Sequence, residues 1–125
     1  KARFIVGCRE LFTENGRIRV KRHIDPDDVA RTRKWLVRNV KGLGYKEASH
    51  FLRNIGFGAD IAILDVHIMR NMLRLGIVKD LPKCLNERCY LDLESRLRAF
   101  SRRAGIPMDA LDILFWSRET GMIFK

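Results

Sequence analysis

Apolar residues recur along most of the chain at the three- and four-residue spacing of amphipathic helices, and glycine or proline interrupts the pattern at intervals. The pattern predicts helices at about residues 1–14, 25–40, 46–55, 65–76, 91–104 and 109–116. Residues 17–24 alternate apolar and basic side chains, but one strand without a partner is not stable, so we interpret this segment as an extended connector. Because no segment repeats and no sheet is evident, the sequence predicts an all-α fold.

Two local signals set the limits of the first two helices. Gly16, which follows Asn15, is expected to end the first helix. Residues 25–28 (DPDD) predict the start of the second, with an Asp cap, Pro at the first helical position and acids at the positive end of the helix dipole. We expect this second helix to bury Val29, Trp35, Leu36 and Val40.

The segment from about residue 26 to 56 reads as a helix, a tight glycine turn (KGLGYK, 41–46) and a second helix. Glycine is expected at two places because the turn needs φ values closed to other residues, and because a bare backbone lets amide groups approach a phosphate closely. The pattern therefore predicts a DNA-binding helix-hairpin-helix, with an ordinary glycine-capped turn as the alternative. Its candidate DNA contacts are Lys41, Gly42, Gly44 and Tyr45.

Composition and charge favour a globular protein that binds a polyanion. The chain has 125 residues, which suffice for one domain, with 46% hydrophobic and 32% charged residues. Its formal net charge of +10 makes nucleic acid the first candidate partner. No stretch approaches the ~20 apolar residues of a membrane span and no signal peptide opens the chain, so we expect a soluble, intracellular protein.

The three cysteines, Cys8, Cys84 and Cys89, predict neither a disulfide framework nor a metal site. Cys84 and Cys89 lack the further paired ligands that zinc or an iron-sulfur cluster requires. We therefore expect unpaired thiols and no cofactor. Whether a monovalent cation sits under the carbonyls of the glycine turn is left open.

Two residues have the chemistry of a catalytic pair. Lys46 is in the first turn of the second helix, where the dipole and a partly desolvated surrounding disfavour the ammonium form, so it could serve as a nucleophile. Asp65 follows 19 residues later and is a credible cap for the next long helix, so two helix N-termini could converge on one site. The alternative for Lys46 is a lysine that contacts phosphate or is merely solvated.

The run KGLGYKEASHFLRNIG, followed by AILDVHI, resembles the helix-hairpin-helix DNA glycosylases, and most closely the 8-oxoguanine DNA glycosylase/lyases. Those enzymes have a lysine in the hairpin and an aspartate in a D-x-H context, which correspond to Lys46, Asp65 and His67. The resemblance implies that His67 contacts a phosphate, although a structural histidine packed beside the hairpin is the alternative.

The C-terminal run LDILFWSRETGMIFK looks like the tail of the small archaeal and thermophile-type second class of these enzymes. There a tail tryptophan and the terminal lysine help to form the base pocket, which makes Trp116 and Lys125 candidate base contacts, with a core role as the alternative for Trp116. Enzymes of that class also have an N-terminal helical region that forms the other wall of the cleft. We therefore expect residues 1–125 to be a single helical catalytic domain and the C-terminal portion of a longer glycosylase.

The resemblance implies a bifunctional enzyme that removes 8-oxoguanine through a lysine Schiff base and then cleaves the strand by β-elimination. Damaged double-stranded DNA is the expected partner, and we expect a monomer. A glycosylase for another lesion is one alternative, although relatives of those types commonly carry a four-cysteine iron-sulfur cluster. The other alternative is a non-catalytic helix-hairpin-helix module, which would have no use for the Lys46 and Asp65 pair.

Overall fold

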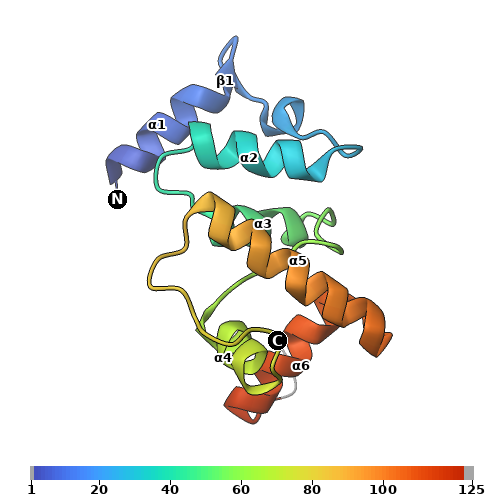
Figure 1. Cartoon of the computed structure of the whole chain (residues 1–125). Helices are drawn as coiled ribbons and strands as arrows, with labels where there is room; N and C mark the ends of the chain where they lie inside the picture. Colours follow the sequence, from blue (N-terminus) through green and yellow to red (C-terminus); the bar gives the residue numbers. More distant parts are fainter. Residues whose placement is uncertain (1, 123–125) are drawn as a thin grey trace. The chain divides into compact units, whose positions relative to one another are not determined.

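The computed structural model describes residues 2–122 of the chain, which forms two compact units, residues 1–57 and 58–125. Helices dominate each unit (Figure 1), so the predicted all-α class is confirmed. Within the described residues a single two-stranded β-hairpin is added to the helices. That the two units form one catalytic domain stays a prediction.

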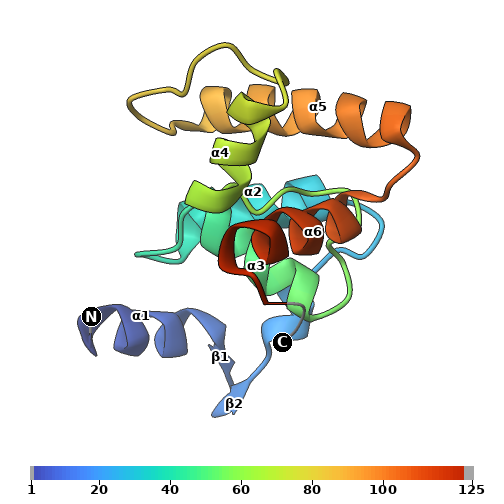
Figure 2. The same ribbon diagram turned by 90° about the horizontal axis from the view of Figure 1, so that it is seen from below.

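The N-terminal unit contains the predicted helix-hairpin-helix. Its elements are α1 (Ala2–Phe12), β1 (Thr13–Glu14), β2 (Arg17–Ile18), the 3-10 helix η1 (Val20–His23), α2 (Val29–Asn39) and α3 (Tyr45–Asn54). α2 and α3 pack against each other, as Figures 1 and 2 show, with residues 40–44 between them. The buried apolar side chains of this unit are Phe12, Leu36, Val40, Ala48 and Leu52.

The interpretation of residues 17–24 as an extended connector is wrong, because residues 17–18 form β2 and residues 20–23 form η1. Thr13 pairs with Ile18 and Glu14 with Arg17 in an antiparallel β-hairpin. The reason is the turn: Asn15 and Gly16 have φ values of 49° and 73°, and Asn-Gly with positive φ at both positions is the preferred two-residue hairpin turn. The same dipeptide that suggested a helix stop therefore reverses the chain, and α1 ends at Phe12 rather than near residue 14.

The second helix begins three residues later than its sequence suggests. Asp28, not Asp25, is the N-cap, and its side chain accepts a hydrogen bond from the Arg31 amide at 2.8 Å. Asp25 instead accepts a bond from the Asp27 amide, and its own amide donates to Thr32 Oγ1 at 2.9 Å. Residues 25–28 contain three aspartates that could each cap the helix. Because the backbone of Asp25 is bonded to Thr32, Asp28 is the residue that takes the N-cap position.

Trp35 was expected in the core but is only half-buried. Its ring stacks on His23 with a centroid distance of 4.3 Å and an interplanar angle of 18°. Leu36 and Val40 are buried as expected, whereas Val29 is half-buried. The tryptophan therefore covers the edge of the unit's core and anchors η1 to α2.

The C-terminal unit is built from α4 (Val66–Arg74), α5 (Glu87–Ala104) and α6 (Met108–Thr120), with α6 packed on both others. α5 begins four residues before the predicted start because Asn86 caps it, accepting a hydrogen bond from the Cys89 amide at 2.9 Å. The buried apolar residues of this unit are Ile61, Ala62, Ile63, Leu64, Ile68, Met72, Val78, Tyr90, Leu93, Leu97, Met108, Leu111 and Phe115.

Candidate active site

The glycine turn, residues 41–44, contains one glycine whose backbone conformation disfavours other residues and one whose conformation does not. Gly42 has a φ of +87°, and a Cβ atom there would lie 2.8 Å from Cδ2 of Phe4, so any larger residue would be strained and would displace the Phe4 ring. Gly44 has an extended backbone, with φ −89° and ψ −179°, which any residue adopts. The expectation that both glycines are needed for their φ values is therefore wrong for Gly44, which is the N-cap of α3.

The turn offers unused hydrogen-bond donors at its surface. Within the described part of the chain, the backbone amides of Lys41 and Gly42 have no hydrogen-bond partner, and both residues are exposed. Unpaired amides in front of a helix N-terminus are suited to an anion such as a phosphate. The geometry is thus compatible with the predicted DNA contacts at Lys41 and Gly42.

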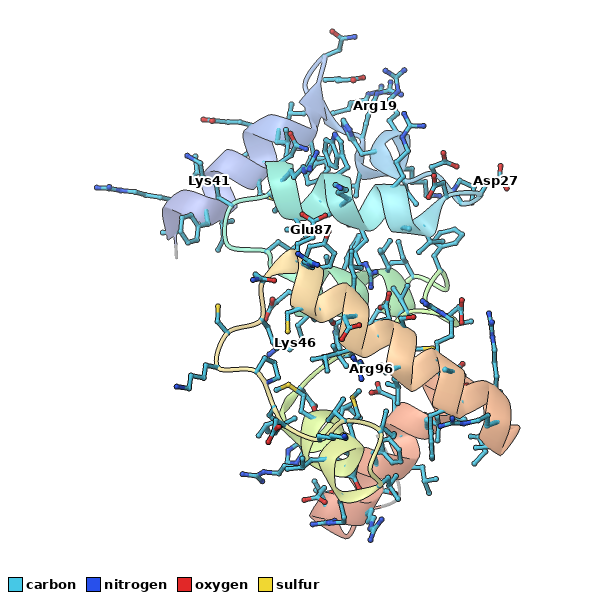
Figure 3. All side chains as sticks on the ribbon, in the orientation of Figure 1. Arg19, Asp27, Lys41, Lys46, Glu87 and Arg96 are labelled. Carbon is cyan, nitrogen blue, oxygen red and sulfur yellow. The ribbon has the colours of Figure 1, made fainter. Side chains whose placement is uncertain are left out.

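Lys46 is the second residue of α3, in the first turn as predicted (labelled in Figure 3). Its side chain is 48% exposed, and its Nζ lies 3.4 Å from Oε1 of Glu47. The expected desolvation of the amine is therefore not found. A nucleophilic role requires the amine to be unprotonated when it attacks the substrate.

Glu47 is a further residue of the candidate site, and the sequence analysis did not identify it. Its Oε2 accepts a hydrogen bond from the Gly44 amide at 3.2 Å. Partial burial acts to raise the pKa of this carboxyl, but its own backbone amide, the Lys46 ammonium and the Gly44 amide outweigh burial and lower the pKa. A glutamate three residues after the cap is the capping-box signal that could have identified it. Its hydrogen bond with the Gly44 amide suits Glu47 to holding the turn.

A buried polar network holds the first turn of α3 against α2. Arg33 of α2 is only 2% exposed, and its Nη1 donates to Ser49 Oγ at 3.1 Å. Ser49 in turn donates to the carbonyl oxygen of Tyr45 at 2.8 Å, and the Arg33 guanidinium lies 5.3 Å from the centre of the Tyr45 ring. Tyr45 is therefore a packing partner within the unit, and its predicted contact with DNA stays a prediction.

In the C-terminal unit, Asp65 is the N-cap of α4, as predicted. Its Oδ1 accepts hydrogen bonds from the amides of His67 and Ile68, both at 2.8 Å. Within the described residues the other oxygen, Oδ2, has no hydrogen-bond partner, and the side chain is half-buried. One oxygen is thus anchored by the helix, while the other has no partner among the described residues.

His67 and Trp116 lie on two helices that Asn71 joins. Nδ2 of Asn71, which is fully buried, lies 2.9 Å from the His67 carbonyl oxygen, 3.4 Å from that of Phe115 and 3.3 Å from Oε1 of Glu119. His67 and Trp116 are half-buried, and Nδ1 of His67 is a buried atom that finds no partner among the residues described. Asn71 was not among the predicted site residues, because nothing in its local sequence marks a polar side chain that links two helices.

The nine predicted site residues fall into three groups. The structure brings Lys41, Gly42, Gly44, Tyr45 and Lys46 together in the N-terminal unit, and it places Asp65, His67 and Trp116 in the C-terminal unit. Lys125 lies outside the described residues. That Lys46 and Asp65 face each other across one cleft stays a prediction.

The described residues contain no cluster of three or more His, Cys, Asp or Glu side chains that could hold a metal ion. The three cysteines are free thiols: Cys8 and Cys89 are partly buried, whereas Cys84 is exposed. Across residues 2–122 no helix is long and apolar enough to span a membrane.

Comparison with known proteins gives consistent results along the whole chain. The family described as 8-oxoguanine DNA glycosylase matches residues 1–106. The 8-oxoguanine DNA glycosylase/AP lyase of Fusobacterium nucleatum is 46% identical over 126 residues, which include 100% of this chain. The crystal structure of the 8-oxoguanine DNA glycosylase of Thermotoga maritima is similar over 99% of this chain, with a TM-score of 0.79 and 39% identity.

A further crystal structure shows a relative with DNA. It contains the 8-oxoguanine glycosylase/lyase of Methanocaldococcus jannaschii in complex with a 15mer DNA containing 8-oxoguanine, and it matches 97% of this chain with a TM-score of 0.71 and 36% identity. The chain spans 58% of the Fusobacterium protein and 56% and 51% of the two crystallised chains, so it corresponds to little more than half of each relative.

Proposed function

The chain belongs to the 8-oxoguanine DNA glycosylase family, and from this premise we propose that it supplies the catalytic helix-hairpin-helix of a base-excision enzyme with Lys46 as nucleophile. The proposed enzyme removes 8-oxoguanine from double-stranded DNA and then cleaves the strand at the abasic site. The observation that carries the proposal is the position of Lys46 in the first turn of α3, directly after a glycine turn with unpaired amides.

In the first step, the damaged nucleotide is flipped out of the duplex, because its sugar and base cannot be reached inside the stack. The amides of Lys41 and Gly42 hold the phosphates of the strand. The neutral amine of Lys46 attacks C1′ of the deoxyribose, the bond from C1′ to the base breaks, and the base leaves with the electron pair and takes up a proton. The bond from C1′ to O4′ then breaks, O4′ takes up the remaining proton of the amine nitrogen, and the double bond between C1′ and nitrogen forms, which gives a Schiff base.

Asp65 stabilises the positive charge that develops on the sugar while the base departs. Its anchored Oδ1 fixes the carboxylate, and its free Oδ2 is available for the sugar. In the second step the imine acidifies C2′, which loses a proton. A double bond forms between C2′ and C3′, and the 3′ phosphate leaves with its electron pair.

The experiment is borohydride trapping with a duplex that contains one 8-oxoguanine, run on the chain and on a longer polypeptide of the relatives' full length that includes it. Borohydride reduces the imine to a stable amine, so a covalent protein–DNA adduct is expected. Lys46→Gln should bind the duplex and give no adduct. Lys41→Gln is the matched control, because it removes a lysine of the same turn and should weaken binding while leaving adduct formation intact at saturating protein.

Two results would contradict the proposal. An adduct with Lys46→Gln would assign the Schiff base to another amine. Tight binding of the lesion duplex without any adduct or base release, in both polypeptides, would instead indicate a non-catalytic DNA-binding module. Parallel duplexes with undamaged guanine and with an oxidised pyrimidine test the base, since excision of the pyrimidine in preference would identify a glycosylase for another lesion.

A further inference from the structure

The chain segment that leads into Asp65 is buried without being part of a helix or a strand. Residues 61–64 (Ile61, Ala62, Ile63 and Leu64) are all buried, with exposed fractions of 9% or less. A buried backbone outside regular structure must find hydrogen-bond partners elsewhere, because an unpaired amide or carbonyl there is costly. The partners of the Ala62 amide, the Ala62 carbonyl and the Leu64 amide are side chains of α5.

Three side chains of α5 bind the segment's backbone in succession. The Tyr90 hydroxyl donates to the Ala62 carbonyl at 2.8 Å and accepts from the Leu64 amide at 3.2 Å. Oε2 of Glu94 accepts from the Ala62 amide at 2.9 Å. Nη2 of Arg98 donates to the carbonyl of Asp60 at 2.8 Å. We call Tyr90, Glu94 and Arg98 the α5 ladder.

The ladder is a regular feature of one helix face. Its members are spaced four residues apart and therefore share one side of α5, which is drawn in orange in Figures 1 and 2. Tyr90 and Glu94 are 2% and 3% exposed. Arg98 lies 3.3 Å from Oε1 of Glu94 and balances its charge. Burying a carboxylate costs desolvation free energy, so Glu94 contributes little net stability. Its contact with the Ala62 amide instead fixes the position of that backbone group.

The backbone that the α5 ladder holds leads directly into Asp65. Leu64, the last residue held by the ladder, precedes Asp65 directly, and the Asp65 amide donates to the Ile63 carbonyl at 2.9 Å. On the other side, Asp65 is tied to α4 through its cap bonds to the amides of His67 and Ile68. The position of the Asp65 carboxylate is therefore constrained on both sides, by the α5 ladder before it in the chain and by α4 after it.

We propose that the α5 ladder is a set of positioning residues for catalysis, in which Tyr90 and Glu94 hold the segment before Asp65 so that its carboxylate stands where the sugar cation forms. The inference rests on the proposed function, since it gives Asp65 its role there. The ladder residues touch no substrate and act through the backbone of residues 60–64. Displacing a catalytic group by ~1 Å can slow a reaction about 10²-fold, so loosening this segment should be visible in the chemical step.

The variants separate positioning from general stability. Tyr90→Phe removes only the hydroxyl that bridges Ala62 and Leu64. Glu94→Leu removes the acceptor of the Ala62 amide, whereas Glu94→Gln keeps an acceptor oxygen there. Ser101→Ala is the matched control on the same helix, since buried Ser101 also binds a backbone carbonyl, that of Ile106 at 2.6 Å, but has no bond to residues 60–64.

For each variant, the thermal midpoint, the Kd for an 8-oxoguanine duplex and the single-turnover rate of base release at saturating protein are measured. We expect Tyr90→Phe and Glu94→Leu to slow base release about 10- to 100-fold while Kd changes by less than about twofold. Glu94→Gln should recover most of the rate. Ser101→Ala should lower the thermal midpoint and leave the rate unchanged.

An unchanged rate in both Tyr90→Phe and Glu94→Leu would overturn the positioning role, as would an equal loss of rate in Ser101→Ala. These outcomes are distinct from failure of the proposed function. If the wild-type chain and the longer polypeptide both release no base from the lesion duplex, the proposed function fails and the positioning role falls with it. If the wild type releases base and the ladder variants match it, only the positioning role is lost.

Discussion

Replacing Gly42 by alanine tests the glycine turn directly, because two separate effects at this position should each lower the free energy of unfolding. A left-handed φ costs a residue with a Cβ atom about 1–2 kcal/mol, and Gly42 has a φ of +87°. The new Cβ would also lie 2.8 Å from Cδ2 of Phe4, whose ring is 48% exposed and must swing toward solvent. Losing the buried half of a phenylalanine costs about 1 kcal/mol. The expected destabilisation is therefore about 2–3 kcal/mol in total.

The assay is a double-mutant cycle measured by urea unfolding, with Phe4→Ala as the second change. In the Phe4→Ala background there is no ring to displace, so Gly42→Ala should cost only the conformational term of about 1–2 kcal/mol. Gly44→Ser is the matched control in the same turn. Its backbone is extended, and the new Cβ would meet only Oε2 of Glu47, at 2.9 Å, which is the end of an exposed side chain that can turn away. The serine hydroxyl can then take over the cap, so the effect should stay within about 0.5 kcal/mol.

Equal costs of Gly42→Ala in the two backgrounds would show that the Phe4 contact does not contribute. A cost for Gly42→Ala below about 0.5 kcal/mol, or one matched by Gly44→Ser, would refute the reasoning about the turn altogether. The variants also bear on DNA affinity. If the unpaired amides of Lys41 and Gly42 hold phosphates, Gly42→Ala should weaken binding more than Gly44→Ser does at equal folded fraction.

Three further predictions concern caps and charges. Asp65→Asn keeps an oxygen for the amides of His67 and Ile68, so the thermal midpoint should change little while base release from a lesion duplex falls by at least about 10²-fold; unaltered release would remove Asp65 from the mechanism. Asp28→Ala should destabilise the chain by about 1 kcal/mol in urea unfolding through loss of the α2 cap, and no change would mean that Asp25 can take its place. Because the fold lowers the pKa of Glu47, its ionised form contributes stability that is present above the unfolded-state pKa and lost as pH falls through the folded-state pKa. Glu47→Gln should therefore be less stable than the wild type near neutral pH and should converge with it in acid, and a constant difference across the titration would contradict this.

Features that depend on neighbours in the sequence could be predicted well. Asp65 caps α4 as expected, because a capping side chain reaches only two or three residues along its own helix. The same reasoning could have found Glu47, which stands three residues after the cap of α3. The Asn15-Gly16 turn was also readable, but the two strands that it joins have two residues each, too few to show an alternating pattern.

Features that depend on distant residues could not be predicted. Tyr90 and Glu94 bind a segment that lies 26 to 32 residues earlier in the chain. Arg33 reaches Ser49 across 16 residues, and Asn71 contacts Glu119 across 48. In the sequence each of these residues is one polar side chain among many on a helix, and nothing near it marks it as buried.

The sequence by itself determined the helices, the glycine turn between α2 and α3, and the residue types available for chemistry at Lys46 and Asp65, because helical periodicity, caps and turns are set by interactions over a few residues. Only the tertiary structure decided which polar side chains are buried and what they hold, from the Arg33 contact with Ser49 to the ladder before Asp65. Burial and partner choice follow from how segments tens of residues apart pack together, and no local pattern carries that information.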